Sequence, residues 1–332
     1  MADADPYFQV RSIANAYWLS RCMHVVTEFG VPDALGDEPE TVEALAAKVG
    51  AHADSLKRVL RALATGGIFE DQGGGRFAHS PASRLLRADN PRSQRGLVRF
   101  AAADYHWAAW GALGQAVKTG RTAFDGIFGC NSFEYYQEHP EDARVFDDAM
   151  ASASAPGIAA ATSAYDFSGF KRIGDIGGGA GHLIRAVLAK APAAEGVVFD
   201  MPHVAGAAPR VAGERLAFEG GDFFNDDLPV CDAYLMMRII HDWDDDRSIA
   251  ILKNLRRAAP PESRLLLVEA VLSDDPKTDW GKITDVEMLV LTGGRERTGE
   301  EYRTLLAAAG FEMLRVIPTA TSISLVEARP AG

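Results

Sequence analysis

A glycine-rich turn at residues 175–181 constrains the fold of this chain more than any other feature. Its sequence, DIGGGAG, lies between an apolar segment at 171–176 and an amphipathic segment at 182–190. Glycines allow the backbone to turn tightly and to approach a ligand without a clash at Cβ. A strand that enters a helix through such a turn is typical of an open, doubly wound α/β sheet.

The rest of the C-terminal half continues this alternation of strand and helix patterns. Apolar runs bounded by polar turns predict strands at 171–176, 196–199, 217–219, 232–237 and 264–269, with a final pair of strands within 311–329. Amphipathic periodicity predicts helices at 182–190, 246–259 and 298–309. We therefore predict an α/β fold with a doubly wound parallel sheet over residues 166–332.

The N-terminal part has a helical pattern instead. Apolar stripes at 42–49 and 56–63 predict two helices, and short segments at 68–70 and 76–79 predict two strands around a glycine turn. This order is typical of a small winged-helix unit. We predict a mainly helical, winged-helix-like dimerisation domain at 1–92. This helical region would expose a long apolar set that a monomer covers poorly, including Tyr17, Leu19, Met23 and Val26.

The region between these two parts, residues 93–165, is predicted to be helical, with a loop at 119–130. It is rich in aromatic side chains, among them Tyr105, Trp107, Trp110 and Phe128. Core packing accounts for most of them, but the density also suits the wall of an apolar ligand pocket. We interpret the region as a linker that lines an acceptor pocket, with Trp107 among the lining residues.

Composition and charge exclude several classes of protein. The chain has 332 residues, enough for two domains, and a formal net charge of −12 from 34 basic and 46 acidic residues. Because this charge repels phosphate backbones, we expect no nucleic-acid partner. No apolar run is long enough to span a bilayer, so we expect no membrane partner. Three scattered cysteines indicate reduced thiols and a cytoplasmic location.

The spacing of the glycines indicates which ligand the turn binds. Gly177, Gly179 and Gly181 form G-x-G-x-G after Asp175, whereas a dinucleotide fingerprint needs G-x-G-x-x-G. The observed spacing is that of S-adenosylmethionine sites, and a plain surface turn is the alternative. Asp200, about 20 residues further on at the end of a strand, is placed to accept the ribose hydroxyls.

A second acidic residue and a histidine follow the next two strands. Asp222 is placed to accept the adenine amino group, with Phe223 on the face of the ring. His241 leaves the strand at 232–237 at its carboxyl end, where side chains meet the ligand crevice. Its ordinary pKa of about 6.5 suits a general base for a phenol, and a structural histidine is the alternative. Glu269 and Glu296 are candidates for holding the imidazole, and no metal-ligand spacing appears.

These motifs resemble those of small-molecule O-methyltransferases of the caffeate and hydroxyindole type, including bacterial members that modify polyketides. DIGGGAGH, GVVFDMPHV, GGDFF, IIHDW and GGRERT occur in the family's order over nearly the whole chain. The resemblance implies a class I methyltransferase sheet, a homodimer, and S-adenosylmethionine as the cofactor without a metal. It places the cofactor against Asp175, Gly177, Gly179, Asp200, Met201, Asp222, Phe223 and Met237, makes His241 the base, and places Met150, Asp285 and Met288 at the acceptor.

The expected activity is methylation of a hydroxyl on a small aromatic or polyketide-like metabolite. The sequence departs from plant members at Met237, where they carry a lysine near the cofactor. Two alternatives stay open on the sequence. One is a non-methylating enzyme of the same fold, such as a hydroxylase, although those relatives tend to lose the histidine. The other is a regulator that senses a ligand and binds DNA through the winged helix.

Overall fold

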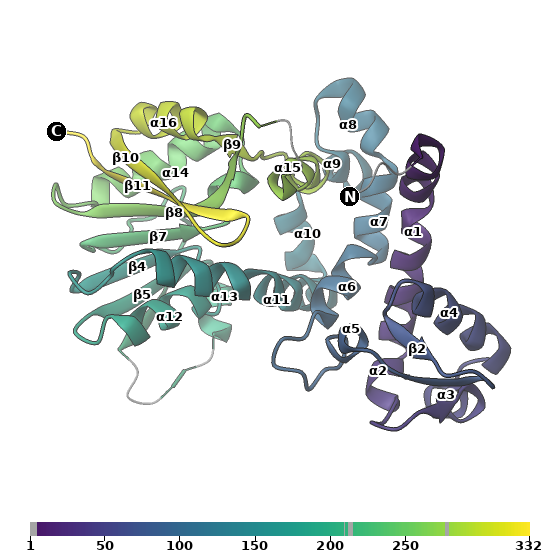
Figure 1. Ribbon diagram of the computed structural model, residues 1–332. Helices are drawn as coiled ribbons and strands as arrows, with labels where there is room; N and C mark the ends of the chain where they lie inside the picture. The colour runs from purple at the N-terminus through teal and green to yellow at the C-terminus, as the bar shows by residue number, and fades with distance from the viewer. Residues whose placement is uncertain (1–4, 209, 212–214, 276–278) are drawn as a thin grey trace. The chain divides into compact units, whose positions relative to one another are not determined.

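The structure is a computed structural model that describes residues 5–208, 210–211, 215–275 and 279–332 (Figure 1). The chain forms two compact units. The first comprises Met1–Ala108 and Tyr136–Ala153, and the second comprises Ala109–Tyr135 and Ser154–Gly332. No helix in the described ranges is long and apolar enough to cross a membrane.

A mixed β-sheet forms the centre of the second unit. Its strand order is β10-β11-β8-β7-β4-β5-β6, with β9 paired to β8. Strands β4 to β8 run parallel to one another. Strand β11 pairs antiparallel with β8, and β10 pairs antiparallel with β11. The strands are β4 (Arg172–Ile176), β5 (Glu195–Asp200), β6 (Leu216–Gly220), β7 (Ala233–Met237), β8 (Arg264–Leu272), β9 (Arg297–Thr298), β10 (Phe311–Pro318) and β11 (Ile323–Pro330). Along the chain, the sequence predicted each of these strands except β9.

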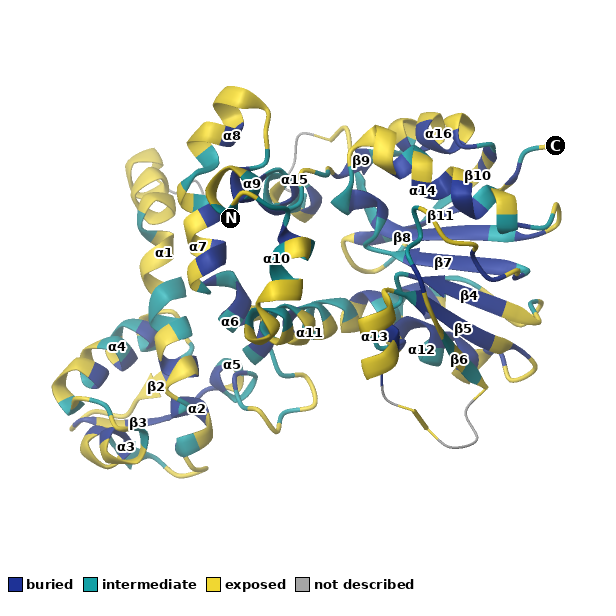
Figure 2. Cartoon of the chain, turned by 180° about the vertical axis from the view of Figure 1, so that it is seen from behind, coloured by how far each residue is buried: buried dark blue, intermediate teal, exposed yellow. Residues whose placement is uncertain are grey.

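Helices cover both faces of this sheet, as expected for a doubly wound fold. One core combines the sheet with the apolar faces of α14 (Asp245–Ala258) and α16 (Gly299–Ala308). The other combines it with α12 (His182–Lys190) and the C-terminal part of α11 (Pro140–Ala164). Figure 2 shows the central strands β4, β5, β7 and β8 largely buried between these layers, whereas the edge strands β6 and β10 carry exposed residues. The short helix α13 (Pro202–Ala207) follows β5.

A group of short helices in the second unit differs from the prediction. Residues 119–130 were expected to form a loop, but Ala123–Phe128 is a helix, α9. Phe124 is fully buried and packs on Phe128, and Gly129 ends the helix in the left-handed conformation. Helix α9 contacts α8 (Leu113–Thr119) and α15 (Trp280–Leu291), and the sequence analysis did not predict α15.

The first unit contains the predicted helix–helix–strand–strand order. Its elements are α1 (Pro6–Glu28), α2 (Val31–Ala34), β1 (Glu40–Thr41), α3 (Val42–Val49), α4 (Ala53–Thr65), β2 (Phe69–Asp71), β3 (Arg76–His79), α5 (Pro81–Arg84), α6 (Arg95–Ala101), α7 (Asp104–Gly111), which extends into the second unit, part of α10 (Ser132–Glu138) and residues 140–153 of α11. Strands β1, β3 and β2 pair antiparallel in that order.

Helix α1 is largely exposed, as Figure 2 shows, and many of its exposed residues are apolar. Tyr17 and Leu19 are 51% and 40% exposed, as predicted. The same prediction was wrong for Met23 and Val26. Val26 is fully buried, and Met23 is partly buried against the core under α3 and α4. Apolar residues on one long helix do not by themselves show which of them face the core of their own unit.

Candidate active site

Functional residues predicted from the sequence gather at the carboxyl ends of the parallel strands. Gly177 follows β4, Asp200 ends β5, and Met237 ends β7. Asp222 lies two residues beyond β6, and Glu269 lies near the end of β8. In open α/β sheets this edge is the place where ligands bind.

The glycine turn after β4 needs glycine for two different reasons. Gly177 has φ +72° and Gly179 has φ +57°, a region that side chains rarely adopt. At Gly177 a Cβ would overlap the side chain of Ile239, so the turn packs directly against the segment after β7. At Gly179 nothing lies within 4 Å of the Cβ position, which leaves room for a ligand.

Two carboxylates support this turn in different ways. Asp200 accepts hydrogen bonds from the backbone N–H of Gly179 at 2.8 Å and of Met201 at 2.7 Å. Burial raises the pKa of Asp200, and these two bonds oppose the rise. Asp175 is completely buried, which raises its pKa to about 7, and its Oδ2 has no hydrogen-bond partner among the described residues. Its carboxyl lies against Gly178, so it supports the turn from below.

The other predicted cofactor residues surround the same turn. Asp222 accepts from Phe224 N–H at 2.9 Å and from Asn225 Nδ2 at 2.7 Å, which fixes its carboxylate. The ring of Phe223 lies beside Gly177, 3.7 Å from the position of its absent Cβ. The side chain of Met237 instead points to helix α11, since its Cε lies 3.1 Å from the Cβ position of Gly157. Met201 is partly exposed.

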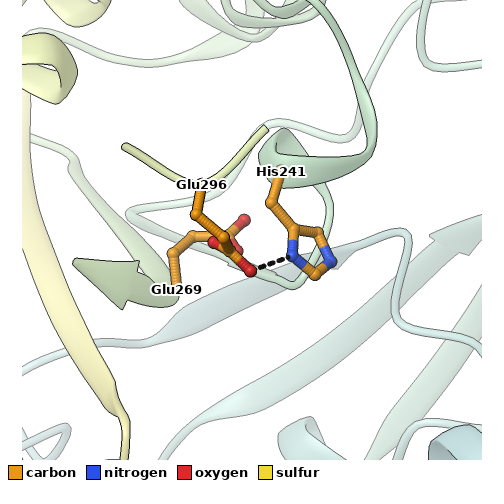
Figure 3. Close-up of side chains that lie close together, drawn as sticks. All are labelled: His241, Glu269 and Glu296. Atoms are coloured by element: carbon orange, nitrogen blue, oxygen red, sulfur yellow. Dashed lines mark hydrogen bonds and ion pairs between the residues drawn. The ribbon is translucent and has the colours of Figure 1, made fainter. Parts of the chain in front are cut away.

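His241 lies in a 3-10 turn, Ile240–Asp242, directly after β7 (Figure 3). Its Nδ1 is 2.9 Å from Glu296 Oε1, which also accepts from Thr284 Oγ1 at 3.2 Å. Glu269 has another partner. Its Oε1 accepts from the backbone N–H groups of Ile239 at 3.0 Å and Ile240 at 2.9 Å. Glu296 therefore orients the ring, while Glu269 holds the backbone of the turn, a division that the sequence left open.

The charges around His241 favour its protonated form. Burial lowers the pKa of the imidazole, but the carboxylates of Asp242, Glu269 and Glu296 together raise it to about 9. Asp242 Oδ1 lies 3.7 Å from His241 Nε2. The sequence analysis named only the two glutamates as partners of the imidazole and missed Asp242, although its place directly after the histidine was a signal. Burial in turn raises the pKa of Glu269 to about 7.

The cluster has the composition of a cation site as well. His241, Glu269 and Glu296 each present a ligand atom, and these atoms lie within 4.8 Å of one another. They are far apart in the sequence, so spacing did not indicate them. Nδ1 is already engaged with Glu296. The expectation that no metal takes part stays a prediction.

The predicted acceptor residues divide between the two units. Asp285 and Met288 lie on α15 in the second unit, and Asp285 Oδ1 accepts from the backbone N–H of Glu296 at 2.8 Å. This bond helps to hold the residue that orients His241, a part that the sequence analysis did not foresee. Trp107 and Met150 lie in the first unit, where Arg21 stacks over the Trp107 ring at 5.2 Å. That these four residues line one pocket stays a prediction.

Comparisons with known proteins bear on the whole chain. Residues 110–312 match the O-methyltransferase domain, and residues 12–89 match the O-methyltransferase dimerisation domain. Phenazine O-methyltransferase PhzM of Lysobacter antibioticus is 44% identical over 321 residues, which cover 95% of this chain and 94% of that protein.

Solved structures agree with these matches. The crystal structure of LaPhzM superimposes with a TM-score of 0.95 at 42% identity and covers 98% of this chain and 100% of that one. Human N-acetylserotonin methyltransferase, solved in complex with S-adenosylmethionine, has a TM-score of 0.92 at 28% identity over 100% of both chains. These comparisons support neither of the two alternatives, a DNA-binding regulator that senses a ligand and a non-methylating enzyme of the same fold. The chain belongs to the O-methyltransferase family, and it is a methyltransferase of secondary metabolism that depends on S-adenosylmethionine and carries an N-terminal dimerisation domain.

Proposed function

We propose that this enzyme methylates a phenolic hydroxyl of a small planar aromatic metabolite, and that His241 takes the proton. The arrangement of the imidazole carries the proposal. Its Nδ1 is bonded to Glu296, whereas Nε2 makes no hydrogen bond to the described part of the chain and has Asp242 as its acidic neighbour at 3.7 Å. A ring that is oriented through one nitrogen and open at the other suits a general base.

The cofactor fits the other half of the sheet edge. Each oxygen of Asp200 accepts one backbone N–H and keeps a further lone pair, which matches a ribose diol. The open space at Gly179 admits the amino-acid portion, and Asp222 and Phe223 would take the adenine. When bound, S-adenosylmethionine supplies a methyl group on a sulfonium, which is a good leaving group. The protein must then align the acceptor oxygen and remove its proton.

The raised pKa of His241 matches this base to a phenol. A phenol has a pKa of about 10, so transfer to an imidazole of pKa 6.5 is uphill by roughly 3.5 units, or about 5 kcal/mol. Transfer to His241, whose pKa is about 9, is uphill by only about 1 unit, or about 1.4 kcal/mol. The proton moves from oxygen to Nε2, and the imidazolium stays paired with Glu296. The proposal uses no metal.

The acceptor and the assembly complete the proposal. Trp107, Met150, Asp285 and Met288 would line a pocket for a flat apolar ring system. The dimerisation domain and the exposed apolar face of α1 support a homodimer. We retain the functional division into residues 1–92, 93–165 and 166–332, and a cytoplasmic location.

Methyl-labelled cofactor tests the proposal. The enzyme should transfer the label to the oxygen of flat phenols and leave aliphatic alcohols untouched, as read by mass spectrometry of the products. Label on nitrogen would overturn the choice of acceptor atom. An unlabelled, hydroxylated product would overturn methyl transfer to this class of acceptor.

A further inference from the structure

The turn that carries His241 is held by a second segment of the chain, which ends at Arg297. Three backbone carbonyls surround the histidine, and all of them accept hydrogen bonds from this segment. Arg295 N–H donates to the carbonyl of His241 at 2.8 Å. The guanidinium of Arg297 donates to the carbonyls of Ile240 at 3.0 Å and Trp243 at 2.9 Å. The turn is thus fixed on both sides of the histidine.

The guanidinium of Arg297 is 1% exposed. Besides the two carbonyls, it contacts Asp245 Oδ1 at 3.0 and 2.8 Å, Ser248 Oγ at 3.3 Å and the carbonyl of Arg295 at 3.3 Å. A guanidinium has five N–H donors in a rigid fork, and here every direction meets an acceptor.

The charge of this buried group has little compensation. Its one carboxylate partner within the described ranges, Asp245, has a side chain that is 57% exposed, and the other acceptors are neutral. Burying a cation in this way costs desolvation free energy that an apolar side chain would avoid. The guanidinium supplies a rigid fork of N–H donors, which neither an apolar side chain nor a lysine has.

The neighbours of Arg297 in sequence act on the same histidine. Glu296 bonds the ring, as described above. At Gly294 a Cβ would overlap the carbonyl of His241, so this segment packs directly on the turn. One short segment therefore holds both the backbone and the ring of the proposed base.

We propose that Arg297 is a positioning residue: its guanidinium fixes the turn so that the His241 ring meets Glu296 with Nδ1 and keeps Nε2 available to the acceptor. The inference rests on the proposed function, since it assumes that His241 is the base. It does not require Arg297 to touch the acceptor or the cofactor.

Two substitutions at Arg297 and one matched control test this role. Arg297→Met removes the fork and the charge, and Arg297→Lys keeps the charge alone. Arg256→Met is the control, because the Arg256 guanidinium also clamps two carbonyls, those of Gly310 at 3.1 Å and Ala331 at 3.0 Å, which do not belong to the His241 turn.

Three measurements separate positioning from general stability. Activity is measured with an ordinary phenol and with an acidic phenol that is already ionised at the assay pH. Calorimetry measures the affinity for S-adenosylhomocysteine. Nuclear magnetic resonance of the ¹⁵N-histidine-labelled protein follows the Nδ1–H signal of His241, assigned by its absence in His241→Gln.

We expect Arg297→Met to lower kcat with the ordinary phenol by roughly 10- to 100-fold, because misplacing a catalytic group by about 1 Å has an effect of this order. The acidic phenol should be largely spared, the affinity for adenosylhomocysteine should change less than twofold, and the Nδ1–H signal should broaden or vanish. Arg297→Lys should fall in between. Arg256→Met should lower the melting temperature without changing the signal or the ratio of the two rates.

An unchanged Nδ1–H signal, or an equal loss with both phenols, would overturn the positioning role. If Arg297→Met does not accumulate as folded protein, the same outcomes in Arg297→Lys decide. The two proposals can fail separately, because the resonance signal is read without turnover. Full activity of His241→Ala would refute the proposed function, and the signal would still show whether Arg297 holds the ring.

Discussion

Replacing Glu296 by glutamine should move the pH dependence of catalysis to lower pH. The neutral imidazole is the active form of a base, so kcat/KM rises with pH through the pKa of His241 in the free enzyme. Three carboxylates raise that pKa to about 9, and Glu296 is the one that bonds the ring, at 2.9 Å. Removing its charge takes away part of the stabilisation of the imidazolium, so the pKa must fall.

The size of the shift follows from this one bond. A hydrogen bond between charged groups contributes about 1.5–3 kcal/mol, and each pKa unit corresponds to about 1.4 kcal/mol, so the pKa should fall by about 1–2 units. The rise in kcat/KM should then centre between about pH 7 and 8. Its plateau should also fall, because a weaker and less firmly oriented base removes the proton more slowly.

Steady-state kinetics between pH 6 and 10 with a phenol of ordinary acidity would measure both effects. The curves of the two enzymes should converge toward neutral pH and separate above it. Glu300→Gln is a suitable control, because the Glu300 side chain is 80% exposed at the start of α16. A profile that keeps its midpoint in Glu296→Gln would refute the assignment of that midpoint to His241.

Three further outcomes are expected. Asp200→Ala should weaken the binding of S-adenosylhomocysteine by about 1.5–3 kcal/mol in calorimetry. The control Asp166→Ala, which removes an exposed carboxylate that also accepts a backbone N–H, should leave the affinity unchanged. If the two variants bind equally well, Asp200 does not belong to the cofactor site. His241→Ala should lose roughly 10²–10⁴ in rate with an ordinary phenol and little with an acidic one, and equal losses would leave the histidine a positioning role only. Light scattering should report a homodimer at micromolar concentration, and Tyr17→Asp on the exposed face of α1 should weaken it; a stable wild-type monomer would contradict the dimer.

The sequence predicted those features that depend on residues close together in the chain. The glycine turn was predictable because positive φ and close approach leave few other residues at Gly177 and Gly179. The strands were predictable because a parallel sheet buried on both faces needs apolar runs. Since the carboxyl ends of such strands meet at one edge of the sheet, the sequence alone predicted that His241 and Glu269 lie close together.

The remaining features depend on contacts between distant segments. Glu296 rather than Glu269 bonds the ring because the segment before β9 is held beside the His241 turn, partly by the bond from the Glu296 backbone N–H to Asp285 on α15, and no spacing in the sequence encodes this. Arg297 lies in a polar turn, GGRER, that is typical of solvent, yet it is among the most buried side chains of the chain. Helix α9 was missed because its six residues are too few to show a period.

The strand order divides the active site along a line between β4 and β7. Gly179, Asp200, Asp222 and Phe223, which are proposed to hold the cofactor, lie at or after the ends of β4, β5 and β6 on one side. On the other side, His241 follows β7, Glu269 lies in β8, and Glu296 directly precedes β9. Mutation can therefore alter one side while the other stays intact. A descendant of such a chain can therefore lose the proposed base, still bind the cofactor, and evolve a different reaction. In protein engineering, substitutions in the segment that ends at Arg297 should retune the reaction without the need to rebuild the cofactor pocket.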